Sequence, residues 1–162
     1  MKFLTHSKLT LVAITLASSF ATTGAFADYH LTAFSETLGF KELVTKDIPA
    51  AEAKFASRSV KNMDYFEANN LCVTQILLEE FEPAIASCST ALDKANFSSE
   101  LTIQKEKIAL AAIYSNLAVA KAMTGDTVGA NVDLEMALTL NKKDGNAHIN
   151  YDLISTNLLA GA

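Results

Sequence analysis

The sequence predicts an all-α protein built from antiparallel helix hairpins, and three observations lead to this prediction. Half of the 162 residues are hydrophobic, many of them Ala and Leu, which favour helices. Pro occurs only at positions 49 and 83, and Gly occurs six times, so few residues interrupt a helix. Finally, alanine recurs at Ala51, Ala84 and Ala130 among apolar residues at helical spacing, which indicates one hairpin design used repeatedly.

The first 27 residues have the features of a secretory signal peptide. Lys2 and Lys8 make a positive start, residues 9–21 are mostly apolar, and Ala25-Phe26-Ala27 matches an AxA cleavage site. The apolar run is too short for a transmembrane helix. We therefore expect cleavage after Ala27 and a periplasmic or secreted protein. The alternative is an uncleaved amphipathic or membrane-anchor helix.

Residues 28–162 are then expected to form a single helical domain. The whole chain has a formal net charge of −5, and loss of the leader removes two lysines and makes the remainder more acidic. An acidic surface repels phosphate backbones and anionic lipids, which argues against nucleic acid or a membrane surface as the main partner. The domain also contains no apolar run long enough to span a bilayer, so no membrane insertion is expected.

The stretch 111–144 carries the clearest internal pattern. It has small or apolar residues where two antiparallel helices would touch, namely Leu117, Ala118, Ala130, Leu134 and Ala137, with Gly125-Asp126 at the turn. In length and spacing it resembles one tetratricopeptide repeat, although Tyr114 replaces the usual Trp and Lys142 the usual Pro. The resemblance implies a short α-solenoid, because one such unit cannot bury its own apolar face.

The same template applied along the chain gives repeats at about 32–64, 65–98 and 111–144. A C-terminal capping helix follows at 145–159, where Asp152 replaces a small residue and suits a polar closing face. The alternative is an irregular bundle of similar alanine-rich helices.

Each helix has a local signal. Phe34, Leu38 and Leu43 predict a helix over residues 32–45, preceded by a frayed start that includes His30. Asp47 is expected to cap a helix that has Pro in its first turn and runs towards residue 60. Further helices are predicted over residues 64–78, 82–95, 99–123, 128–140 and 146–159. The helix over 99–123 would project past its neighbours, so that Leu101, Ile108 and Leu110 need cover.

The two cysteines are Cys72 and Cys88. The repeat register that the resemblance implies places them opposite each other on two antiparallel helices, and export favours a disulfide. Two buried free thiols and a redox-active pair are the alternatives. The sequence has no CxxC motif, which argues against a thiol oxidoreductase.

A polar series also follows the repeat register, with Asn70, Asn116 and Asn150 at equivalent places. In the family this place faces a concave groove, where an Asn amide can both donate to and accept from the backbone of an extended peptide. The resemblance therefore implies a groove that also includes Asn69, Val73, Leu77, Val119 and Met123. The alternative is that these Asn side chains bond the adjacent repeat and hold the stack together.

The sequence offers no catalytic set, no cofactor motif and no His, Cys or carboxylate spacing typical of a metal site. We therefore expect a non-enzymatic protein that needs no cofactor or metal and binds a peptide or protein segment. A homo-oligomer is the alternative to a monomer. The alternative function is a structural accessory subunit or stabiliser of an envelope or secretion complex.

Overall fold

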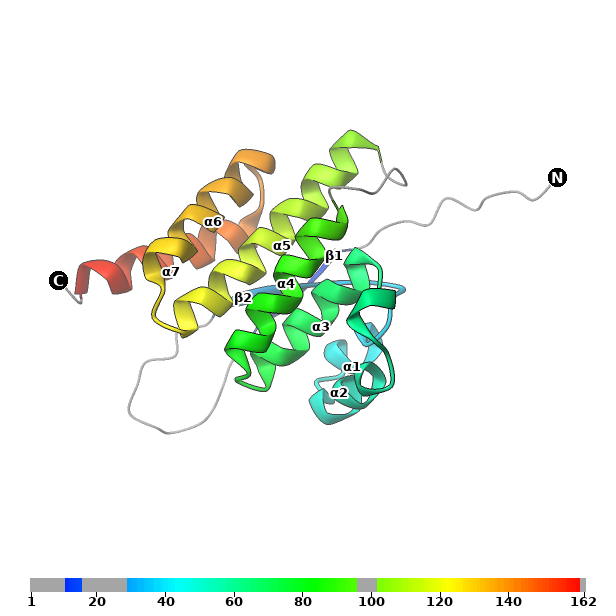
Figure 1. Ribbon diagram of the computed structural model, residues 1–162. Coiled ribbons are helices and arrows are strands. Elements are labelled where there is room, and N and C mark those ends of the chain that lie inside the picture. Colours follow the sequence, from blue (N-terminus) through cyan, green and yellow to red (C-terminus); the bar gives the residue numbers. More distant parts are fainter. Residues whose placement is uncertain (1–10, 16–28, 96–101, 161–162) are drawn as a thin grey trace.

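A computed structural model describes residues 11–15, 29–95 and 102–160, and these residues are mostly helical (Figure 1). Two short strands, β1 (Leu11–Thr15) and β2 (His30–Phe34), form an antiparallel pair. The helices follow as α1 (Phe40–Val44), α2 (Ile48–Ala56), the 3-10 turn η1 (Val60–Asn62), α3 (Tyr65–Leu77), α4 (Phe81–Ala95), α5 (Ile103–Met123), α6 (Thr127–Leu140) and α7 (Gly145–Ala160). The predicted all-α class is confirmed for most of the described chain.

The helices from α3 to α7 pack successively, each against the next one in the chain (Figure 1). In addition, α3 contacts α5, and α5 contacts α7. Strand β2 packs against α3, α5 and α7, so these three helices form the layer that faces it. Ala51, Ala84 and Ala130, the alanines on which the hairpin prediction rests, are all fully buried in the core.

The predicted helix over residues 32–45 is wrong. Its first part is β2, and only Phe40–Val44 is helical. Between them, Glu36 and Gly39 have positive φ angles of 61° and 79°, which an α-helix does not allow. The expectation that His30 lies in a frayed start is also wrong, because it is the first residue of β2. Aromatic and β-branched residues around it, such as Thr32 and Phe34, suit a strand.

Local capping signals placed the later helices well. The Asp47 side chain accepts a hydrogen bond from the Ala50 amide and caps α2, which ends at Ala56 rather than near residue 60. Asp64 and Glu67 form a capping box at the start of α3. Asp126 caps α6 through the Gly129 amide.

Helix α5 begins at Ile103, whereas the prediction began at residue 99; residue 101 and the predicted start lie outside the described residues. At its N-terminal end the side chain of Ile103 is 74% exposed. Ile108 is half-buried, and Leu110 packs against the core. The exposed N-terminal part of α5 that projects past its neighbours is therefore shorter than expected.

The disulfide between Cys72 and Cys88 is confirmed. The two Cα atoms are 5.3 Å apart, and the bond joins α3 to α4 inside the core. It closes a loop with a sequence separation of 16 residues, which on the chain-entropy model stabilises the fold by about 3 kcal/mol.

One ion pair lies between α5 and α6. Lys121 Nζ is 2.6 Å from Asp133 Oδ2, and Asp133 is only 7% exposed. Burial raises the pKa of Asp133 above its ordinary value, and the Lys121 ammonium opposes this rise. The buried surroundings of Asp133 therefore disfavour the charged form of its carboxyl group.

The predicted leader covers β1, which is the only part of residues 1–27 that the structure describes. Residues 1–10 and 16–28, including the expected cleavage site, lie outside the described residues. Within the described ranges, no helix has the length and hydrophobicity needed to cross a membrane.

Candidate functional site

The candidate site is a row of asparagine side chains that holds the backbone of β2. Asn70 Oδ1 accepts from the Phe34 amide at 2.8 Å, and its Nδ2 donates to the Phe34 carbonyl at 2.9 Å. Asn116 makes the same two bonds to Thr32, at 2.9 and 2.8 Å. Each amide thus imitates the edge of a neighbouring strand. We call Asn70, Asn116 and Asn150 the asparagine ladder.

Asn150 completes the ladder at the other end. Its Oδ1 accepts from the His30 amide and its Nδ2 donates to the His30 carbonyl, both at 2.8 Å. The three asparagines lie on α7, α5 and α3, in the order in which β2 crosses these helices. A strand advances about 6.7 Å in two residues, and packed helices lie about 8–10 Å apart, so a crossing strand meets one helix roughly every second residue.

The ladder also binds its own neighbours. Asn116 Nδ2 donates to Asn69 Oδ1 at 2.8 Å, and Asn150 Nδ2 donates to Ser115 Oγ at 3.0 Å. Asn69 in turn donates to the Thr32 carbonyl at 2.9 Å. These side chains therefore join neighbouring helices, and the extended backbone that they hold is β2 of the chain itself; binding of a partner peptide stays a prediction.

Burial makes these hydrogen bonds energetically important. Asn69, Asn70, Asn116 and Asn150 are all fully buried. The bonds to Thr32 and Phe34 are buried too, so no solvent can replace a partner that is lost there, whereas the bonds to His30 are only part-buried. An unpaired buried donor or acceptor costs about 1–3 kcal/mol. The groups are neutral amides, so the ladder holds the strand without any charge.

The strand itself fills the predicted groove. Leu31, Ala33 and Phe34 are fully buried, and the Phe34 ring meets the Phe66 ring of α3 edge to face with centroids 4.8 Å apart. The sequence predicted that these amides hold the extended backbone of a partner peptide, whereas in the structure they hold residues 30–34 of the chain itself. The available signal was the cluster of aromatic and β-branched residues ahead of the positive-φ turn.

The apolar residues predicted for the groove are part of the same buried region. Val73 and Val119 are buried in the core, and Leu77 and Met123 are half-buried and pack against it. These four residues therefore do not line an open apolar channel beside β2.

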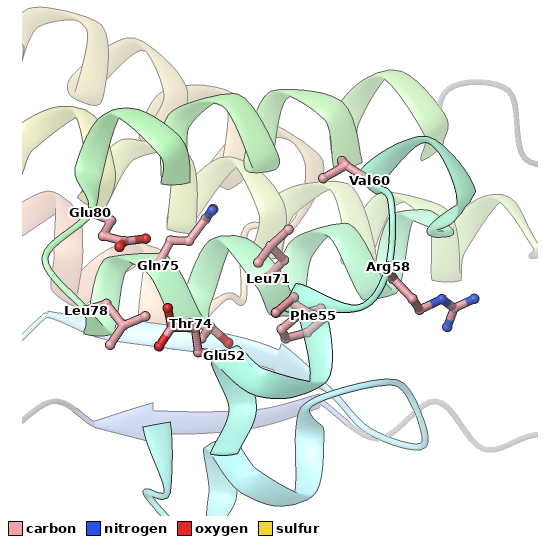
Figure 2. A pocket seen from close by; sticks show the side chains of 10 residues that line it. Glu52, Phe55, Arg58, Val60, Leu71, Thr74, Gln75, Leu78 and Glu80 are labelled. Carbon is pink, nitrogen blue, oxygen red and sulfur yellow. The ribbon is translucent and has the colours of Figure 1, made fainter. Parts of the chain in front are cut away.

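A separate hollow of about 260 Å³ lies between α2, α3 and the start of α4 (Figure 2). Phe55 and Leu71 lie near its centre, whereas Glu52, Glu80 and Gln75 bring polar groups to it. Its lining includes Arg58 but no His, Cys or Lys, and none of the three ladder asparagines lines it. In the described part of the chain, no three His, Cys, Asp or Glu side chains are grouped to hold a metal ion.

Comparison of the chain with protein-family models, curated proteins and solved structures gives no match.

Proposed function

We propose that this chain is an exported, non-enzymatic interaction module of tetratricopeptide-like design that binds an extended segment of a protein partner at the face formed by α3, α5 and α7, where the ladder holds β2 as a template. One observation carries the proposal, which is the asparagine ladder. It holds the backbone amide and carbonyl of alternate residues and uses no feature specific to their side chains. Such a face binds extended polypeptide as a class.

The tetratricopeptide-like design is supported by the order of packing. Successive antiparallel pairs would place equivalent helices in one layer, and α3, α5 and α7 share contacts with β2. Export is supported by the leader pattern and by the disulfide, since disulfides persist in oxidising compartments.

The test uses peptides selected from a random library on the matured protein, with affinities measured by fluorescence anisotropy. Asn150→Ala alters the ladder at its part-buried end, where the fold tolerates the change best. We expect it to weaken the selected peptides at least five-fold. The matched control Val132→Asp, on the exposed side of α6, should leave their affinity unchanged. Equal affinities in wild type and Asn150→Ala would contradict the proposal.

A second function, a structural accessory subunit of a larger envelope or secretion complex, is favoured by a different observation. Val128, Val132 and Met136 recur every fourth residue on α6 and are 68%, 60% and 43% exposed, so one apolar stripe faces outwards. If the peptides or a co-purifying protein were lost in Val132→Asp but retained in Asn150→Ala, this outer stripe would be the docking face instead.

A further inference from the structure

The two edges of β2 have different partners. The amide and carbonyl groups of His30, Thr32 and Phe34 all point to the ladder. Backbone groups of neighbouring residues in a strand point to opposite edges, so those of Leu31 and Ala33 point away from the helices. We call the edge formed by these two residues the outer edge of β2.

In the full chain the outer edge is covered by β1. The register pairs Val12 with Ala33, Ala13 with Thr32 and Ile14 with Leu31 in antiparallel order. Because Leu31 and Ala33 present the outer edge, their pairs are the hydrogen-bonded ones, and the pair between Ala13 and Thr32 is not. Among the structural elements, β1 contacts chiefly β2, so the helices and the ladder do not depend on it.

β1 lies within the predicted leader, so cleavage of the leader would end its pairing with β2. Cleavage after Ala27 removes β1 and leaves β2 fixed to the helices by the ladder. An unpaired strand edge is a template for another extended chain. The edge remains rigid, because three buried amides still hold the opposite side of the strand.

We propose that the outer edge of β2 is the binding site for a partner and accepts one antiparallel, extended segment in the place of β1. This inference rests on the proposed function and specifies its site, because the partner adds to β2 and does not displace it from the ladder. The segment is uncharged and rich in β-branched and apolar residues, as is the sequence LVAIT that occupies the place in the full chain. Its hydrogen bonds go to Leu31 and Ala33.

The probe for the test is a synthetic peptide with the sequence of residues 8–17, KLTLVAITLA, lengthened by two terminal lysines for solubility. Its binding is measured by fluorescence anisotropy to the protein recovered after export, whose N-terminus is established by mass spectrometry. We expect binding to the matured protein and at least ten-fold weaker binding to the uncleaved chain, where β1 already covers the edge.

Two proline variants of the probe test the register. Proline at the place of Val12 removes an amide that faces Ala33, so it should weaken binding at least ten-fold. Proline at the place of Ala13 removes an amide that faces away from β2, so it should weaken binding less than three-fold. Equal effects of the two prolines, or no binding of the unmodified probe to the matured protein, would overturn the proposal.

Proline variants of the protein itself provide a second test of which edge of β2 binds the probe. Ala33→Pro removes the outer-edge amide and should abolish probe binding, whereas Thr32→Pro removes an amide held by Asn116 and should lower the unfolding midpoint. If Ala33→Pro fails to fold, amide hydrogen exchange of the wild type answers the same question. Probe binding should slow exchange at Leu31 and Ala33 and leave Thr32 unchanged.

The remaining outcomes separate this inference from the proposed function. Faster exchange at Thr32 on probe binding would mean that β2 is displaced from the ladder, which overturns addition to the outer edge and retains ladder binding. A dimer of the matured protein that the probe cannot dissociate would show that a second copy of the chain occupies the outer edge of β2. Recovery of the uncleaved mass would overturn the replacement of β1 by a partner, and the library test with Asn150→Ala would still decide ladder binding.

Discussion

Replacing Asn116 by alanine tests the ladder as a source of stability. In the variant the Thr32 amide loses its acceptor, Asn116 Oδ1, and Asn69 Oδ1 loses the donor from Asn116. The Thr32 carbonyl still accepts from Asn69. Two buried polar groups are thus left unpaired, at about 1–3 kcal/mol each. We expect Asn116→Ala to lower the free energy of unfolding by about 2–6 kcal/mol.

Asn150→Ala is the matched comparison, because it removes the same kind of double hydrogen bond from the end of the strand. The bonds to His30 are only part-buried, so water can replace the lost partner there. We expect a cost of about 1–2 kcal/mol. Urea unfolding of both variants, followed by helical circular dichroism under non-reducing conditions, measures the difference.

The reasoning is refuted if Asn150→Ala costs as much as Asn116→Ala, or if neither costs more than about 1 kcal/mol. Asn116→Asp adds a control for lost volume, because it keeps the size of the side chain but removes the Nδ2 donor. Its buried carboxylate should have a raised pKa, so this variant should gain stability relative to wild type as the pH falls.

Three further predictions concern single features of the fold. Replacing Cys72 and Cys88 together by alanine should lower the free energy of unfolding by about 3 kcal/mol, measured by urea unfolding against wild type with and without reductant. Gly39→Ala should be more destabilising in thermal unfolding than Gly125→Ala, because both have positive φ but only the first would place its Cβ 2.5 Å from a buried aromatic ring. The raised pKa of Asp133 means that the folded state holds this proton more tightly than the unfolded state. The wild type should therefore lose stability relative to Asp133→Asn as the pH rises above about 4. A difference in unfolding free energy between the two proteins that stays constant from pH 4 to pH 7 would contradict this.

The helices from α2 to α7 could be predicted because their signals are local. Asp64 caps α3 and Asp126 caps α6, each through a residue three positions further along. The pairing of Cys72 with Cys88 was implied by the repeat register of the tetratricopeptide resemblance, which sets the two helices of a hairpin opposite each other. Information of this kind is contained in windows of a few residues, which a single sequence makes visible.

The strand β2 could not be predicted, because its partners are far away in the chain. The asparagines that hold Phe34, Thr32 and His30 are separated from them by 36, 84 and 120 residues. Apolar residues at positions 34, 38 and 43 therefore predicted a helix, and nothing nearby opposed it. The long-range hydrogen bonds outweighed the local pattern, since each ladder amide would otherwise be buried without a partner.

The ladder also explains why the kind of ligand is easier to infer than its identity. Its amides hold the backbone, which every polypeptide shares, and they carry no charge that would select a charged partner. Sequence preference must then come from side chains packed beside the strand, as Phe34 packs on Phe66. In the place of β1 the outer edge likewise offers only the backbone of Leu31 and Ala33. A partner that adds to the outer edge, as proposed, would be selected chiefly by its ability to remain extended over about five residues. Strand addition typically supplements this weak requirement with contacts outside the strand.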